Sequence, residues 1–140
     1  MTRGYLGSSR RSERGQAMVE FALVLPLLLV LAFGIMDFGR ALQAYVTINN
    51  AAREGARTGS ITPSTGTIQN TVRDSAGDFG DDVDINVSYP DGNESGGSVR
   101  VRVEYDYTMI TPLGSMIGLA SGGALDESFA LRATSDMRIE

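Results

Sequence analysis

The sequence predicts an α+β fold in which a long N-terminal transmembrane helix continues into a stalk and packs against a three-stranded antiparallel sheet. Three observations predict this fold: an almost uncharged apolar run over residues 17–36, a stripe with helical spacing over 41–59, and three later segments that alternate with a period of two. A helix needs about 20 apolar residues to cross roughly 30 Å of hydrocarbon. The two periodicities separate helix from strand.

The composition leaves little room for catalysis. The 140 residues include no cysteine and no histidine, and all twelve basic residues are arginines. The absence of cysteine excludes disulfide frameworks, zinc ribbons and thiol catalysis, and the absence of histidine removes the commonest general base and metal ligand. Without lysine, Schiff-base and serine–lysine chemistry are excluded as well. We therefore expect no enzyme, no cofactor, and no catalytic or metal-binding residues.

Charge divides the chain at the apolar run. The first fifteen residues carry four arginines and one acid, whereas residues 41–140 carry seven arginines and fourteen acids, a net charge of −7. Basic flanks of a membrane helix stay in the cytoplasm. Residues 1–15 are therefore predicted to be a basic cytoplasmic leader, and the C-terminal domain is predicted to be extracytoplasmic. An acidic domain also disfavours nucleic acid as a partner.

The transmembrane helix is predicted over residues 16–39, as a single pass. Phe21 to Met36 are uncharged, and Asp37-Phe-Gly-Arg40 follows in place of the small-x-small site that a removed secretory signal requires. A retained anchor is therefore favoured over a cleaved signal. Glu20 is the exception in this run, because a carboxylate costs about 2.5 to 3.5 kcal/mol at a bilayer centre. A snorkelling interfacial acid is one interpretation of Glu20.

The helix is expected to continue out of the membrane as a stalk over residues 40–60. Six apolar or small residues spaced by four and three positions fall on one helical face: Ala41, Tyr45, Ile48, Ala52, Gly55 and Gly59. Gly59, Ser60 and Pro63 mark the end of this helix. Residues from Gln16 to about Arg57 would then form one rod.

The remaining residues, 61–140, are predicted to form an extracytoplasmic α+β domain. A short amphipathic helix carries Ile68, Val72, Ala76 and Phe79 at helical spacing. Strict alternation then predicts strands over residues 83–89, 99–109 and 129–139, with one apolar and one wet face. The apolar face of this sheet needs a cover, and the stalk helix carries the complementary stripe.

Between the second and third strands lies a short apolar turn. Pro112 suits the first helical position, and Leu113, Met116 and Ile117 follow it. We predict that these three side chains form a contact surface, because they lie off the alternating strands and are flanked by glycines. The alternative is that the turn folds over an open end of the sheet.

Four acids crowd the segment before the first strand: Asp78, Asp81, Asp82 and Asp84. Calcium takes several oxygen ligands, but the spacing lacks the glycine and the closing glutamate of an EF-hand loop. A solvated acidic turn is the favoured interpretation, and a weak calcium site is the alternative.

The N-terminal third resembles a known signal. A basic leader ends at Gly15, Glu20 is the fifth residue after it, Phe21 follows, and an apolar helix begins, as in the prepilin signal of type IV pilins. The longer stretch 13–57, including Asp-Phe-Gly-Arg at 37–40 and Asn-Ala-Ala-Arg-Glu-Gly-Ala-Arg at 50–57, is similar to the TadE-like family of pseudopilins of tight-adherence (Tad or Flp) pilus systems. The tail over 105–140 is similar too, with less specificity.

The resemblance implies a pilin-like fold and a minor pseudopilin-like structural or assembly subunit of a type IV pilus system with a role in adhesion. It implies cleavage by a prepilin peptidase between Gly15 and Gln16, and assembly and charge-pairing roles for Glu20 and Phe21. The implied partners are the lipid bilayer, other pilins and pseudopilins, Tad inner-membrane assembly proteins and the peptidase. The location would be the membrane or the pilus itself. The alternative function is a bitopic, membrane-anchored extracytoplasmic binding module.

Overall fold

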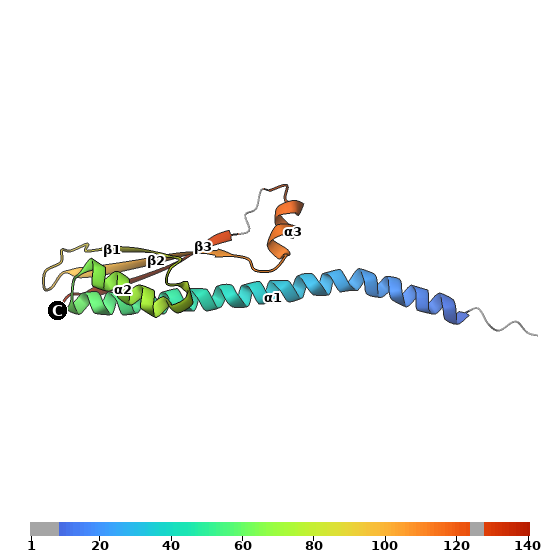
Figure 1. Ribbon diagram of the computed structural model, residues 1–140, viewed down its shortest axis with the longest axis horizontal. Helices are drawn as coiled ribbons and strands as arrows, with labels where there is room; N and C mark the ends of the chain where they lie inside the picture. Colours follow the sequence, from blue (N-terminus) through green and yellow to red (C-terminus); the bar gives the residue numbers. More distant parts are fainter. Residues whose placement is uncertain (1–8, 124–127) are drawn as a thin grey trace, which may run out of the picture.

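The computed structural model describes residues 9–123 and 128–140, and it has one long helix that carries a small α+β domain on its distal half (Figure 1). The predicted fold class is confirmed. In chain order the elements are α1 (Ser9–Ile61), α2 (Thr65–Ala76), the 3-10 turn η1 (Gly77–Phe79), β1 (Val83–Ser88), β2 (Ser98–Thr108), α3 (Leu113–Ala120) and β3 (Ser128–Arg138).

Helix α1 is one continuous rod of 53 residues, about 80 Å long at 1.5 Å per residue. The predicted rod is confirmed, but it begins at Ser9, ahead of Gln16, and ends at Ile61 rather than near Arg57. Arginine and glutamate are good helix formers, so the helix extends back into the basic leader. Pro26 lies inside the helix, which continues past it without interruption to Ile61.

The sheet has the order β1-β2-β3 with antiparallel neighbours, so β2 is the central strand. The three predicted strands are confirmed to within one residue at each end. On the wet face, Arg100 of β2 donates from Nε to Asp136 Oδ1 of the opposing β3 position at 2.8 Å. This bond lowers the pKa of Asp136.

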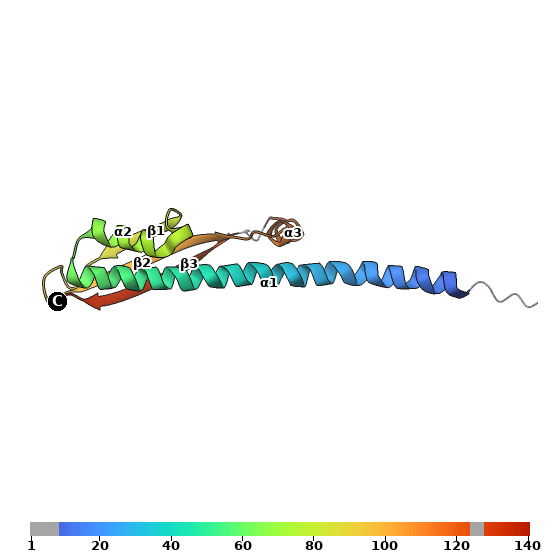
Figure 2. The same cartoon turned by 60° about the horizontal axis from the view of Figure 1, so that its bottom comes forward.

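The apolar face of the sheet packs on a layer made of the distal half of α1 and the shorter α2 (Figures 1 and 2). Helix α1 contacts β2 and β3, whereas α2 contacts α1 and β1. The largest fully buried side chains come from α1, α2 and β2: Ile48, Ile68, Val72, Val99, Val101 and Val103. Every one of these residues lies on a face that the periodicity assigned to the core.

The buried stripe of α1 follows the predicted spacing with one correction. Tyr45 was expected to be buried, but it is 45% exposed, and Ala44 is buried in its place. Because the helical period is 3.6 residues, positions 44 and 45 both lie near the stripe, and the close approach of the sheet favours the smaller side chain. Farther along, a Cβ added to Gly55 would lie 2.4 Å from Val72 Cγ2. Gly55 is therefore a position where α1 and α2 approach too closely for any side chain.

Replacing Gly55 by alanine is expected to destabilise the domain by about 1 to 3 kcal/mol, because Val72 has a stiff β-branched side chain and must move. The measurement is urea unfolding of the full chain in detergent micelles, followed by the near-ultraviolet circular dichroism of its five tyrosines. Gly66→Ala is the matched control, since an added Cβ at Gly66 in α2 meets nothing within 4 Å. Equal stability of the two variants would contradict the packing described.

Candidate functional site

The N-terminal half of α1 is an apolar surface that nothing in the domain covers. From Gly15 to Ala32 every side chain is exposed, and only Phe33 and Gly34 are partly covered before Asp37. The described part of the chain contains one helix that is long and apolar enough to cross a membrane, and no residue of its apolar window is buried. A core helix of a soluble domain would be largely buried, whereas a lipid-facing or self-associating helix is apolar all round.

The predicted processing and assembly residues lie at the start of this surface. Gly15 is inside α1, and an added Cβ there would meet nothing within 4 Å. Gln16 and Glu20 lie one turn apart and share an open helix face with Val19 and Leu23. Phe21 is 62% exposed. The structure thus brings Gln16 and Glu20 to one face and leaves all of these side chains free for another partner.

Asp37 is the junction between the free half of α1 and the half that carries the sheet. It is only 5% exposed. Its Oδ1 accepts from the backbone N–H of Ile110 at 2.9 Å and from that of Thr111 at 3.4 Å, and its Oδ2 accepts from the Thr111 hydroxyl. Carboxylates that accept several hydrogen bonds are stable in buried surroundings without a cation. The segment between β2 and α3 is therefore tied to α1 through this carboxylate.

Tyr107 strengthens the same junction from the sheet. Its hydroxyl donates to the backbone carbonyl of Asp37 at 3.1 Å, and its ring packs against Phe129 across the β2–β3 ladder, with 5.3 Å between ring centroids. Burial and then the charge of Asp37 raise the pKa of Tyr107, so its hydroxyl stays protonated and remains a donor.

Asp37 was not predicted as a site residue, because in the sequence it directly follows the apolar run. The spacing of the buried stripe could have found it. Counting back four residues from Ala41 gives Asp37, and three more gives Gly34. An acid on the buried face of an amphipathic helix needs hydrogen-bond donors from the packed element, which here are those of the β2–α3 segment.

The predicted contact turn is a two-turn helix, α3, that lies against α1 beyond the end of the sheet. Pro112 precedes the helix rather than occupying its first position. Leu113 Cδ2 lies 3.9 Å from the place of a Gly34 Cβ, and Leu113 and Ile117 line a groove with α1, whereas Met116 is 49% exposed. The three predicted residues are therefore divided between two faces of α3.

A second groove shares Gly34, Phe38 and Leu113 with the first. It has a volume of about 180 Å³. Its lining comes from α1, β2, the loop after β2, α3 and β3, and comprises Gly34, Asp37, Phe38, Ala41, Tyr107, Met109, Leu113 and Phe129. Apart from the Asp37 and Tyr107 polar groups this lining is apolar, so the groove extends the apolar surface of α1 toward the sheet.

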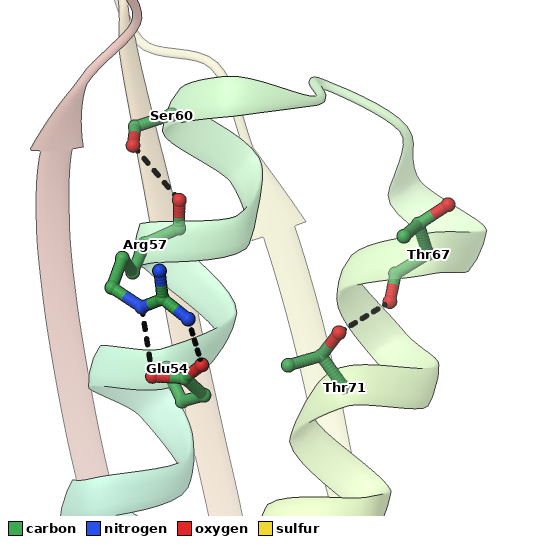
Figure 3. Close-up of polar contacts among 5 residues, drawn as sticks. All are labelled: Glu54, Arg57, Ser60, Thr67 and Thr71. Carbon is green, nitrogen blue, oxygen red and sulfur yellow. Dashed lines mark hydrogen bonds and ion pairs between the residues drawn. The ribbon is translucent and has the colours of Figure 1, made fainter.

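The segment 50–57 at the far end of α1 has a packing role. Ala51, Ala52, Gly55 and Ala56 are buried against the sheet and α2. Glu54 and Arg57 form an ion pair on the opposite side (Figure 3), with Arg57 Nε donating to Glu54 Oε2 at 3.0 Å. The hydrogen bond from Arg57 lowers the pKa of Glu54. Small residues therefore face the core, and the charged residues remain in solvent.

The four acids before β1 are all exposed: Asp78, Asp81, Asp82 and Asp84. Within residues 15–123 and 128–140, whose side chains the structure describes, no group of three or more Asp or Glu side chains is placed to share a metal ion.

The fold and the exposed apolar half of α1 together define the class of protein. It is a small α+β domain carried on one apolar helix that is long enough to anchor it in a membrane. The model of the TadE-like protein family matches residues 15–57, roughly a third of the chain. The resemblance of this segment to the TadE-like family is thus confirmed, and the family suggests an association with Tad pilus systems. Neither the curated proteins nor the solved structures gave a match.

The matched segment contains the residues on which the site depends. It begins at Gly15, includes Glu20, Phe21 and Asp37, and ends at Arg57, the last residue of the alanine- and glycine-rich packing segment. The match stops before the sheet begins. The similarity therefore covers the apolar surface and the stripe that carries the domain.

Replacing Asp37 by alanine is expected to loosen the β2–α3 segment by about 1 to 3 kcal/mol, because the Ile110 and Thr111 donors lose their acceptor in a partly buried site. Hydrogen exchange of the full chain in micelles should then be faster at the amides of Ile110 and Thr111. Asp106→Ala, at an exposed position of β2, is the control and should leave both amides protected. If the Ile110 and Thr111 amides exchanged as slowly in the Asp37→Ala chain as in the wild type, the proposed attachment through Asp37 would be contradicted.

Proposed function

We propose that the chain is a minor pseudopilin-like structural or assembly subunit of a Tad (Flp) type IV pilus system, in line with the TadE-like match over residues 15–57. It is held in the membrane by a single pass over residues 16–39, with leader 1–15 in the cytoplasm. Stalk 40–60 and domain 61–140 lie outside. The observation that carries the proposal is the exposure of α1 on all sides over its apolar half.

Exposure on all sides fits a subunit that exchanges lipid for other helices. In lipid, such a surface is solvated by acyl chains, and association there depends on close packing rather than on the hydrophobic effect. The sheet covers only the distal half of α1 (Figure 2). A helix that is free over its apolar half can leave the bilayer and pack into a bundle without any rearrangement of the domain. Its neighbours there are other pilins and pseudopilins.

Processing between Gly15 and Gln16 fits the placement of both residues. The bond lies near the start of α1, and glycine lowers the stability of a helix by about 1 kcal/mol relative to alanine. Local unwinding at Gly15 is therefore favoured over unwinding elsewhere in this region. The basic leader keeps the bond on the cytoplasmic side, where a prepilin peptidase acts on it.

Cleavage creates an amino group on Gln16, one helical turn from Glu20. An unpaired charge inside an apolar bundle is costly, and residues four apart on a helix are neighbours. Glu20, on the same subunit or on an adjacent one, supplies the opposite charge, while the exposed Phe21 ring supplies apolar contact area. A domain of 80 residues is also large beside the very short major pilins of such systems, which favours a minor subunit.

Gly15→Leu is expected to block processing, because a large side chain obstructs the bond to be cut. Intact-mass measurement of the chain from cells that contain a prepilin peptidase should give Gln16 as the first residue of the unmodified sequence and Met1 for the Gly15→Leu chain. Glu20→Ala should be cut normally but incorporated poorly, since removing one member of a buried pair costs about 3 to 5 kcal/mol.

Gly39→Leu is the matched control for processing, because Gly39 is also an exposed α1 glycine with nothing within 4 Å of an added Cβ. Glu20→Asp, which keeps the charge, is the control for incorporation. An uncut wild-type chain would contradict the pseudopilin proposal and favour the bitopic binding module, in which the helix is only a tether. If the chain is cut and the Glu20→Ala variant is incorporated as well as the wild type, only the charge-pairing mechanism is contradicted.

A further inference from the structure

Helix α3 lies at the level of the apolar half of α1, not at the level of the sheet. Both views place it beyond the end of the sheet, beside the middle of α1 (Figures 1 and 2). Its Leu113 and Ile117 line a groove with Val30, Leu31 and other residues of α1 up to Phe38. The helix also runs across α1 rather than along it (Figure 1).

The segment that contains α3 carries no charge. From Tyr107 to Gly123 the sequence has no Asp, Glu, Lys or Arg, although the domain as a whole is acidic. Large apolar side chains are exposed in and near this segment: Leu119 is 86% exposed and Met116 is 49% exposed, and Ile110 and Phe129 are also exposed. Beside them, the exposed Phe38 of α1 extends the same apolar belt.

The bilayer covers this level if α1 is the membrane anchor. The uncharged run of α1 ends at Met36, so the outer edge of the hydrocarbon lies near that residue. Val30 is six residues before it, which is about 9 Å deeper along the axis at 1.5 Å per residue. The α1 residues that line the α3 groove therefore begin inside the hydrocarbon and end just outside it.

We propose that α3 and the loop before it lie in the outer interfacial layer of the lipid bilayer, with Met116 and Leu119 in contact with acyl chains. The proposal rests on the membrane anchoring given under the proposed function. A short helix that lies across the anchor is parallel to the membrane plane, and interfacial helices bury their apolar face to roughly 5 to 10 Å. The apolar belt is continuous with the lipid-facing surface of α1, which identifies lipid as the occupant.

Charge at the edge of the segment fits this placement. Arg40 is exposed on α1 one turn beyond Asp37, where a cationic side chain reaches the headgroups. Asp37 itself is buried, and its oxygens are bonded to Ile110 and Thr111, so it presents no bare charge to the lipid. The surface that α3 and the loop before it present to the interfacial layer is therefore uncharged.

The test uses tryptophan, which the chain lacks. Single variants of the full chain, Leu119→Trp on α3, Leu27→Trp on the apolar half of α1 and Asn70→Trp on α2, are reconstituted in phosphatidylcholine and phosphatidylglycerol vesicles. Fluorescence is quenched by phosphatidylcholine brominated on its acyl chains, and separately by aqueous iodide. All three positions are exposed on the protein, so the substitutions should not disturb folding. Met116→Trp is a second α3 probe.

Brominated lipid is expected to quench Leu119→Trp at least half as strongly as Leu27→Trp, and more when the bromines lie near the carbonyl end of the chain. Asn70→Trp should respond to iodide alone. The α3 placement would be overturned if iodide alone quenched Leu119→Trp and Met116→Trp, as it should quench Asn70→Trp. The membrane anchor would still hold in that case if brominated lipid quenched Leu27→Trp. Shielding of the α3 probes from both quenchers would mean that another protein segment covers α3, which also overturns it. Failure of Leu27→Trp to respond to lipid would overturn the anchoring itself.

Discussion

The burial of Asp37 of α1 against Tyr107 of β2 and the segment between β2 and α3 is the contact on which the architecture depends. A single helix serves two environments: its first half is apolar on all sides, and its second half has a narrow stripe of small residues under the sheet. Asp37 lies where these two halves meet, and its carboxylate accepts hydrogen bonds from Ile110 and Thr111. These bonds fix where along α1 the sheet lies and which face of the helix it covers.

This attachment explains why the domain can remain small. Three strands have one apolar face, and they need a cover to be stable. The stripe of α1 and the short α2 provide that cover, and Gly55 and Gly59 let the strands approach the helix closely. Tyr107 lies near the end of the central strand β2, and its hydroxyl donates to the Asp37 carbonyl, so this end of the sheet is fixed to α1. The apolar half of α1 is then left free for lipid or for other subunits.

Periodicity predicted most of the fold because each element has one buried face. The three strands, α2 and the stripe of α1 could be located from spacing alone. Spacing did not distinguish Tyr45 from Ala44, since both lie near the stripe and the distance to the sheet decides between them. It also did not place α3, because a short apolar helix packs equally well on a sheet end or on another helix, and the Asp37 bonds that select α1 join residues more than 70 positions apart.

The candidate site could be predicted only in part. An acid at Glu20 within an apolar run is compatible with a snorkelling interfacial residue as well as with a paired charge, and the resemblance to the prepilin signal is what favours the second. The family match over residues 15–57 supports the resemblance of the segment as a whole. Asp37 was missed because its function in the fold depends on donors from a distant loop.

The central claim, that α1 leaves the bilayer at Asp37 as an unbroken helix, is tested most directly by cysteine labelling, since the chain has no cysteine of its own. Single cysteines are introduced at the exposed positions Leu23, Leu31, Leu42 and Asn50, and a membrane-impermeant maleimide is added to the extracytoplasmic side of intact membranes. The account predicts labelling at Leu42 and Asn50, and protection of Leu23 and Leu31 until detergent is added. Labelling of Leu31 as fast as Leu42, or protection of Leu42, would contradict it.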